Sequence, residues 1–363
     1  MGFKCGIIGL PNVGKSTIFS ALSTAEAEIA NYPFCTIDPN IGVIAVPDKR
    51  LEHIASIINP PKFTHTTIEF VDIAGLVKGA SKGEGLGNKF LGHIRNVDAI
   101  VHIVRCFDDP NVAHIHGTID PVSDIEIVNT ELILADLETV DKRIEKIESL
   151  SKKGDKTYRK ELDLCLTIQS FLGRGIAARN TNLADTGKIL RELGLITAKE
   201  MLYVANVSEA VLKGEGDYLT KIQSVADKEG AKVITICGDM EAEIAMLPED
   251  ERKDFLDDLG LRESGLQKLI RTGYDLLGLI TFYTTAGKEL RAWTVEKGTK
   301  ASKAAGKIHS DMERGFIRAE VLNYSDFITF KGMSEAKEKG LVRIEGRDYT
   351  ICDGDIVYFR FNV

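Results

Sequence analysis

The sequence lacks the features that mark several classes of protein. Its six cysteines are scattered over 363 residues, with no CxxC pair and no Cys/His cluster at zinc-site spacing, which argues against a disulfide scaffold or a zinc site. Reduced thiols are typical of a cytosolic protein. No apolar run approaches the roughly 20 residues that span a bilayer, and the N-terminal residues resemble neither a signal peptide nor a myristoylation site. We therefore expect a cytoplasmic protein without a membrane segment.

An excess of basic residues is also missing, because the formal net charge is −8. Contact with nucleic acid would need a local basic face rather than a general attraction. Hydrophobic residues make up 44% and charged residues 28% of the chain, which is typical of a globular protein. Its length allows two or three domains.

Short apolar runs separated by helical stretches indicate the fold class. The runs occupy residues 3–9, 67–73, 98–104, 201–206 and 232–237. Continuous runs of this kind are typical of buried strands in a mostly parallel sheet that helices cover on both faces. The sequence therefore predicts the α/β architecture of a nucleotide-binding domain.

A long helical segment separates two of these runs. Between residues 104 and 201, a polar turn at 152–156 divides two amphipathic stretches. We expect a helical hairpin, a coiled-coil arm, over residues 129–197, inserted into a domain made of residues 1–128 and 198–277. Two helices packed flat on the sheet are the alternative. The first stretch repeats apolar residues at the spacing of a heptad seam, at Ile133, Leu137, Val140, Ile144 and Ile147.

The C-terminal residues 278–363 differ in character. Their short runs alternate between apolar and polar residues and are bounded by turn residues. Alternation with a period of two is typical of strands in a small β domain. We expect a mixed β domain here.

A phosphate-binding loop is the most specific motif in the chain. Residues 9–16 match GxxxxGK[ST], directly after a predicted strand and before a predicted helix. Gly9 and Gly14 allow backbone N–H groups to surround the phosphates, and the helix adds the positive end of its dipole. Lys15 is expected to neutralise the β- and γ-phosphates, and the Ser16 hydroxyl to bind Mg²⁺. The motif predicts nucleotide contacts from Asn12, Val13, Gly14, Lys15, Ser16 and Thr17.

Two further positions complete a predicted magnesium site. Asp72 begins a DxxG motif at the end of a predicted strand, where its carboxylate can hold Mg²⁺ through water. The backbone N–H of Gly75 can meet the γ-phosphate, so loss of that phosphate would release the loop and switch the protein. Thr36 lies between the P-loop helix and this strand, and its hydroxyl can complete the metal shell. Together with the P-loop, these residues predict a nucleotide switch.

The run at 201–206 leads into the motif NVSE, residues 206–209. Together with GLPNVGKST, NYPFCTIDPN and VDIAGLVKGASKGEGLGN, in this order, it resembles the Obg-like ATPase family, usually called YchF, in the Obg-related branch of translation-factor-type P-loop proteins. The resemblance extends over essentially the whole chain. It implies an OBG-type P-loop domain, the helical insertion, and a C-terminal TGS-like domain with a β-grasp fold.

The NVSE motif departs from the Asn-Lys-x-Asp pattern with which most relatives read guanine. Val207 replaces the lysine and Glu209 replaces the aspartate, which should weaken guanine selectivity. A carboxylate that faces the N1 acceptor of adenine would be repelled, so we expect Glu209 to turn aside and leave Asn206 and Val207 at the base. The resemblance implies an ATPase that tolerates GTP poorly. Cys237, at the end of the last apolar run, is also expected at the nucleotide.

The motifs do not identify the group that orients the attacking water. Leu76 follows the DxxG motif, and leucine cannot orient water as the glutamine of many GTPases does. We favour His114, which follows the strand at 98–104 on the side where ligands bind in open α/β sheets; the alternative is that every histidine is structural or faces solvent. The catalytic residues expected are thus Lys15, Gly75 and His114. Asn12 resembles an asparagine that binds K⁺ in some relatives, so K⁺ is a candidate cofactor beside Mg²⁺.

Basic residues gather in two places on this acidic chain. Clustered positive charge favours binding to a phosphate backbone, although a solvated charged face has the same composition. Since TGS domains recur in translation-associated proteins, the resemblance implies binding to the ribosome (the large subunit or the whole ribosome) or to RNA. We expect a monomeric, slowly hydrolysing ATPase switch; the alternatives are an Obg-type GTPase, or a binding module whose nucleotide only sets its conformation. The two clusters are Lys288, Arg291, Lys297, Lys300, Lys303, Lys307, Arg314 and Arg318, and Lys142, Arg143, Lys146, Lys152, Lys153 and Lys156.

Overall fold

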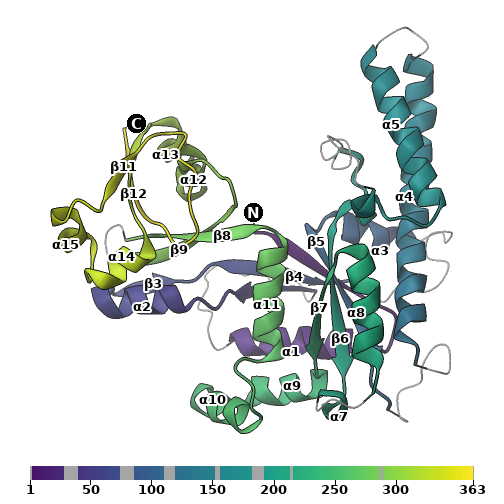
Figure 1. The fold of residues 1–363 in the computed structure, drawn as a ribbon, viewed down its shortest axis with the longest axis horizontal. Coiled ribbons are helices and arrows are strands. Elements are labelled where there is room, and N and C mark those ends of the chain that lie inside the picture. Colours follow the sequence, from purple (N-terminus) through teal and green to yellow (C-terminus); the bar gives the residue numbers. More distant parts are fainter. Residues whose placement is uncertain are drawn as a thin grey trace. The chain divides into compact units, whose positions relative to one another are not determined.

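The computed structural model divides the chain into two compact units (Figure 1). The first unit comprises Phe3–Gly42 and Glu69–Leu269, and the second comprises Val43–Ile68 and Ile270–Val363. The structure describes residues 2–27, 40–73, 86–109, 119–151, 156–181, 192–212, 216–285 and 289–362.

The first unit is built on a six-stranded sheet with the strand order β2-β4-β1-β5-β6-β7. β1 pairs in parallel with β4 and β5, and β6 pairs in parallel with β5 and β7. β5 is buried along its whole length, because a continuous apolar strand needs cover on both faces. The predicted parallel sheet is therefore confirmed. Its strands are β1 (Lys4–Ile8), β2 (Ile41–Ala45), β4 (Thr67–Asp72), β5 (Ala99–Cys106), β6 (Glu200–Val207) and β7 (Lys232–Ile236).

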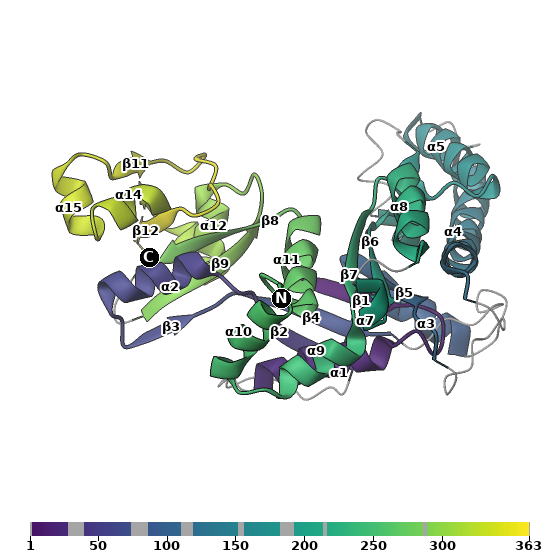
Figure 2. The ribbon, with the colours of Figure 1, turned by 60° about the horizontal axis from the view of Figure 1, so that its bottom comes forward.

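Helices cover both faces of this sheet. α1 packs against α9, whereas α4 packs against α8 and β5, and Figure 2 shows these two sets on opposite faces. The carboxyl ends of the parallel strands meet at one edge between the two helical layers, which is where ligands bind in open α/β sheets. The helices that lie wholly in this unit are α1 (Lys15–Ala27), α3 (Leu86–Arg95), α4 (Pro121–Ser151), α7 (Glu209–Leu212), α8 (Tyr218–Glu229), α9 (Gly238–Met246) and α10 (Glu249–Asp258). α11 (Gly265–Leu276) has residues in both units.

The predicted helical hairpin is present. α4 and α5 (Lys156–Gly173) pack along each other, and Figure 1 shows the pair extending beyond the sheet. The seam between them buries Val140 and Ile147 of α4 and Ile168 of α5, so the heptad pattern marks a helix-to-helix contact rather than two helices lying flat on the sheet. α4 begins at Pro121 rather than at residue 129, and one continuous helix therefore runs from the sheet into the arm.

Asp136 holds the chain where it returns from the arm to the sheet. Its buried carboxylate accepts hydrogen bonds from the backbone N–H groups of Ile196 (2.8 Å) and Thr197 (2.7 Å) and from the Thr197 hydroxyl (2.6 Å). Burial raises the pKa of this carboxyl, and the bonds from Thr197 and Ile196 oppose that rise. The donors belong to η2 (Ile196–Ala198), directly before β6, so Asp136 positions the strand that leads to the NVSE motif.

The second unit is a mixed sheet with the strand order β11-β10-β12-β8-β9-β3. Three pairings are antiparallel: β8 with β9, β10 with β11, and β10 with β12. Two are parallel: β8 with β12, and β3 with β9. The predicted mixed β domain is confirmed. Its elements are β3 (Lys62–Thr64), β8 (Leu279–Thr284), β9 (Glu289–Glu296), β10 (Phe316–Leu322), β11 (Arg343–Glu345), β12 (Ile356–Phe361), α2 (Lys49–Ile58), α12 (Ala301–Ile308), α13 (Ser310–Arg314), α14 (Tyr324–Thr329) and α15 (Met333–Glu338).

The second unit also takes in residues 43–68, which lie within the predicted range 1–128 of the nucleotide-binding domain. The apolar face of α2 explains this difference. Leu51 and Ile54 are fully buried in a cluster with Tyr283 and Leu290, and burial of two such side chains contributes roughly 1.5–3 kcal/mol each. Residues 43–68 thus pack on the C-terminal sheet.

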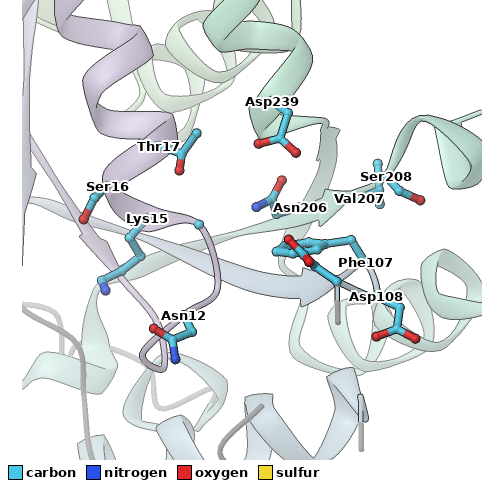
Figure 3. Close-up of a pocket in the computed structure, with 12 residues that line it drawn as sticks. Asn12, Lys15, Ser16, Thr17, Phe107, Asp108, Asn206, Val207, Ser208 and Asp239 are labelled. Atoms are coloured by element: carbon cyan, nitrogen blue, oxygen red, sulfur yellow. The ribbon is translucent and has the colours of Figure 1, made fainter. Parts of the chain in front are cut away.

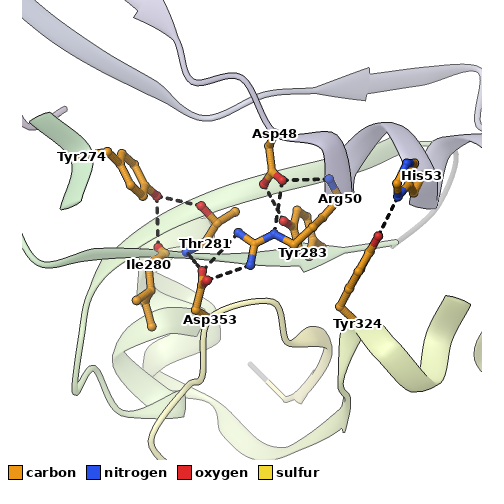
Figure 4. A network of polar contacts seen from close by, with 9 residues as sticks. All are labelled: Asp48, Arg50, His53, Tyr274, Ile280, Thr281, Tyr283, Tyr324 and Asp353. Atoms are coloured by element: carbon orange, nitrogen blue, oxygen red, sulfur yellow. Dashed lines mark hydrogen bonds and ion pairs between the residues drawn. The ribbon is translucent and has the colours of Figure 1, made fainter. Parts of the chain in front are cut away.

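A polar network at the start of α2 accompanies this apolar contact (Figure 4). The guanidinium of Arg50 donates to both carboxylate oxygens of Asp353 (2.7 and 3.2 Å) and to Asp48 (3.2 Å). The Tyr283 hydroxyl donates to Asp48 (2.5 Å), and the Thr281 backbone N–H donates to Asp353 (2.9 Å). Bidentate arginine–carboxylate bonds fix orientation as well as distance. The network therefore fixes the orientation of α2 relative to the C-terminal sheet.

Among the described residues, no helix combines the length and the hydrophobicity that a membrane-spanning segment needs.

Candidate nucleotide-binding site

The loop between β1 and α1 has the backbone conformation that the P-loop motif requires. Gly14 has a φ of +89° and Asn12 a φ of +64°, in the left-handed region that favours glycine and asparagine. A Cβ at Gly9 would lie 2.6 Å from the carbonyl oxygen of Ile103, and one at Gly14 would collide with the side-chain amide of Asn206. Both glycines are therefore needed for close packing as well as for the turn.

Asn206 ties the P-loop to two other elements. Its side chain, 4% exposed, donates from Nδ2 to the carbonyl oxygen of Val13 (2.9 Å) and accepts at Oδ1 from the backbone N–H of Gly238 (3.0 Å). Asn206 lies near the end of β6, and Gly238 is the first residue of α9. One buried amide thus joins the P-loop, β6 and α9, and an alanine here would leave a buried carbonyl and a buried N–H without these partners.

Lys15 and Asp72 are oppositely charged groups that act on each other at the P-loop. Burial lowers the pKa of Lys15, and the charge of Asp72 opposes that shift. Burial raises the pKa of Asp72, and the charge of Lys15 opposes that rise. The Oδ1 atom of Asp72 is buried and has no hydrogen-bond partner among the described residues, so this carboxylate is placed to receive a ligand.

The residues present fit a magnesium ion. In the described parts of the chain, no group of three or more His, Cys, Asp or Glu side chains is placed to hold a metal. Mg²⁺ is usually bound by one or two carboxylates together with phosphates and waters, rather than by a cage of protein ligands. The orphan oxygen of Asp72 and the hydroxyl of Ser16 match that pattern.

A cavity of about 440 Å³ lies beside the P-loop, within the range of small-molecule sites. Figure 3 shows Lys15 and Ser16 at one side of it and Asn206 and Asp239 farther along. The cavity can therefore take an elongated ligand with phosphates at Lys15 and a base near Asn206. Its lining consists of Asn12, Gly14, Lys15, Ser16, Thr17, Phe107, Asp108, Asp109, Asn206, Val207, Ser208 and Asp239.

The structure brings together most of the residues predicted at the nucleotide. Val13 is buried, does not line the cavity, and contributes the carbonyl oxygen that accepts from Asn206. Cys237 is buried as the residue before α9, where burial raises the pKa of its thiol, and it does not line the cavity. Glu209 is exposed as the first residue of α7 and does not line the cavity either. Thr36, Gly75 and His114 lie outside the described residues.

Sequence reasoning missed Arg105. Its side chain, 1% exposed, donates from Nε to the carbonyl oxygen of Phe107 (3.1 Å) and from Nη1 to that of Asn12 (3.5 Å). The guanidinium lies 4.7 Å from the centre of the Phe107 ring, close enough for a cation–π contact. An arginine that directly follows an apolar run was the available signal. Ser208 also lines the cavity and belongs to the NVSE motif, which could have indicated it. Asp108, Asp109 and Asp239 line the cavity too, but they belong to no motif.

Sequence models of two families match the chain. Residues 4–146 match a family described as a 50S ribosome-binding GTPase. Residues 279–362 match the YchF GTPase C-terminal family, which is described as a protein of unknown function.

Individual relatives match over the full length. Proteins named "Ribosome-binding ATPase YchF" from Haemophilus ducreyi and Bacillus subtilis are each 52% identical to the chain, over 100% of both sequences. A solved structure, the YchF GTPase of Schizosaccharomyces pombe, is 35% identical and superposes with a TM-score of 0.90 over 99% of this chain and 98% of the other. With half its residues shared along its entire length and the same fold, the chain belongs to the YchF family.

Proposed function

We propose that this protein is a magnesium-dependent ATPase switch that associates with the ribosome. The observation that carries the proposal is one cavity lined by both the P-loop with Lys15 and the NVSE motif with Asn206, which is buried against the loop. The charge of Asp72, whose orphan carboxylate oxygen has no protein partner among the described residues, acts on Lys15 at this cavity. The bacterial relatives are named ribosome-binding ATPases, whereas the Schizosaccharomyces pombe structure is titled a GTPase. The base preference must therefore be argued from the site.

Each residue has a distinct task in hydrolysis. Lys15 and the backbone N–H groups of the P-loop bind and orient the β- and γ-phosphates. Ser16, Thr36 and Asp72 would hold Mg²⁺, which when bound neutralises charge on those phosphates. The Gly75 backbone N–H would bind the γ-phosphate. Loss of that phosphate on hydrolysis would then release the loop that contains Gly75.

The described lining of the cavity lacks the contact with which relatives select guanine. In the Asn-Lys-x-Asp pattern an aspartate accepts bonds from the N1–H and exocyclic amine of guanine. Here Val207 lines the cavity and Glu209 does not, so the contact that would reward guanine is missing from the described lining. A site without that contact loses its selectivity for guanine.

The test is to measure the Kd and the turnover of ATP and GTP side by side, with Mg²⁺ and in either K⁺ or Na⁺. We expect ATP to bind at least about tenfold more tightly than GTP, with slow hydrolysis. We also expect faster turnover in K⁺, because Asn12 lines the cavity and would hold that ion near the phosphates. Tighter binding of GTP would instead indicate an Obg-type GTPase, and equal rates in K⁺ and Na⁺ would remove K⁺ from the proposal.

His114 is proposed to orient the attacking water. A His114→Ala variant should lower ATP turnover by about 10²-fold, the usual contribution of a general base or water-orienting group, while the Kd for ATP stays the same. His309 provides the control, because it is an exposed histidine at the start of α13 in the second unit, and His309→Ala should leave turnover unchanged. If His114→Ala hydrolyses ATP at the original rate, another group positions the water.

Ribosome association is proposed to use the basic residues of the arm and of the C-terminal unit. Several of them already have acidic partners: Lys142 bonds to Glu138, Lys303 bonds to Glu313, and Arg318 lies 3.5 Å from Glu320. Exposed pairs of this kind contribute only about 0–1 kcal/mol, so a phosphate backbone can compete for these cations. Binding of the monomer to the large subunit or to the whole ribosome should therefore weaken as salt is raised.

A further inference from the structure

Asp239 lies at the end of the cavity that holds Asn206. It belongs to the first turn of α9, its side chain is exposed, and it lines the cavity. Figure 3 shows its carboxylate beside Asn206 and away from Lys15 and Ser16. A carboxylate near the phosphates would repel them, but one at this end would face the base.

The polar atoms of Asn206 are already engaged within the protein. Its Nδ2 donates to Val13 and its Oδ1 accepts from the backbone N–H of Gly238. That N–H belongs to the start of α9 and would otherwise be a donor for an oxygen on the base. Because the Gly238 N–H already donates to Asn206, it is not a free hydrogen-bond donor for a 6-oxo group at this end of the cavity. The carboxylate of Asp239 adds a charged acceptor at the same end.

The bases differ in what they present to such an acceptor. Adenine carries an exocyclic amine at position 6, which donates hydrogen bonds, whereas guanine carries an oxygen there, which accepts them. We propose that the Asp239 carboxylate accepts a hydrogen bond from the 6-amino group of adenine and repels the 6-oxygen of guanine. The inference rests on the proposed function, since it requires that ATP occupy this cavity, and it assigns the choice of base to a residue outside the NVSE motif.

The experiment compares three nucleotides in each protein: ATP, GTP, and purine riboside 5′-triphosphate, which has hydrogen in place of the 6-amino group. The original protein should bind ATP about tenfold more tightly than the purine analogue, as expected for one hydrogen bond to a charged group. In Asp239→Ala this ratio should fall to about one, and GTP should bind several-fold more tightly than before. Asp239→Asn, which keeps an uncharged acceptor of the same shape, should give an intermediate ratio.

The control variant is Glu243→Gln, which removes one exposed negative charge from the same helix, one turn farther along. It should keep the ratio of the original protein. A first-turn carboxylate also stabilises a helix, but a loss of stability would weaken the binding of all three nucleotides together and leave their ratios unchanged. An unaltered ratio of ATP to purine analogue in Asp239→Ala would overturn the inference, whereas a preference of the original protein for GTP would overturn the proposed function itself.

Discussion

Lys15→Ala is expected to lower ATP turnover by about 10³-fold, the upper range for removal of one group that stabilises transition-state charge. Lys15 is the P-loop lysine and lines the cavity. Its ammonium group is partly buried, and this burial lowers its pKa. Charge–charge interactions are stronger in such a partly buried site than in water. Phosphate release under saturating ATP measures the rate, and calorimetric titration measures the accompanying loss of affinity.

Lys142→Ala is the control for the loss of a lysine. Lys142 is exposed on α4 and pairs with Glu138 one helical turn away, so its removal should leave turnover unchanged. Wild-type turnover in Lys15→Ala would remove the P-loop from the mechanism. Lys15→Ala also distinguishes a switch from a binding module. If Lys15→Ala binds ribosomes as the original protein does, with or without ATP, the protein acts as a binding module rather than as a switch.

Asp72→Asn should lower turnover by about 10²-fold at ordinary Mg²⁺ concentrations and shift the magnesium requirement upward. The asparagine keeps the shape of the side chain but removes the charge and one of the oxygens that can receive the ion. Burial raises the pKa of Asp72 in the folded protein. At pH values above the pKa that Asp72 has in the unfolded chain, the ionised carboxylate therefore destabilises the folded state. The melting temperature of the nucleotide-free variant should therefore not fall. Turnover measured over a range of Mg²⁺ concentrations, with thermal melts, checks both expectations.

Asp98→Asn is the matched control, because it makes the same change near the start of β5, where Asp98 accepts a hydrogen bond from the Lys4 backbone N–H (2.8 Å). This carboxylate lies at the opposite end of the parallel strands from the cavity, since Asp98 precedes β5 and Asp72 ends β4. Its variant should keep the original magnesium dependence. A magnesium requirement in Asp72→Asn equal to that of the original protein would show that Asp72 does not serve the metal.

Local patterns were enough to predict the layers of the first unit. A buried parallel strand needs a continuous apolar run, and the five runs read from the sequence correspond to β1, β4, β5, β6 and β7. The heptad spacing from Ile133 to Ile147 predicted the seam of the hairpin for the same reason: the period of a helix is visible within a few turns. The P-loop was equally readable, because its function depends on residues that are adjacent in the chain.

The sequence alone therefore determined the parallel sheet, the hairpin, the C-terminal β domain and the P-loop. Tertiary structure decided which unit contains residues 43–68 and which side chains meet at the cavity. These contacts join residues far apart in the chain, so no periodic pattern in the sequence indicates them. The Arg50–Asp353 bonds, which accompany the packing of residues 43–68 on the C-terminal sheet, join positions 303 residues apart. The bond from Asn206 to Val13 spans 193 residues. Asp239 has no motif at all, and only the packing of α9 beside β6 and the P-loop places its carboxylate in the cavity near Asn206.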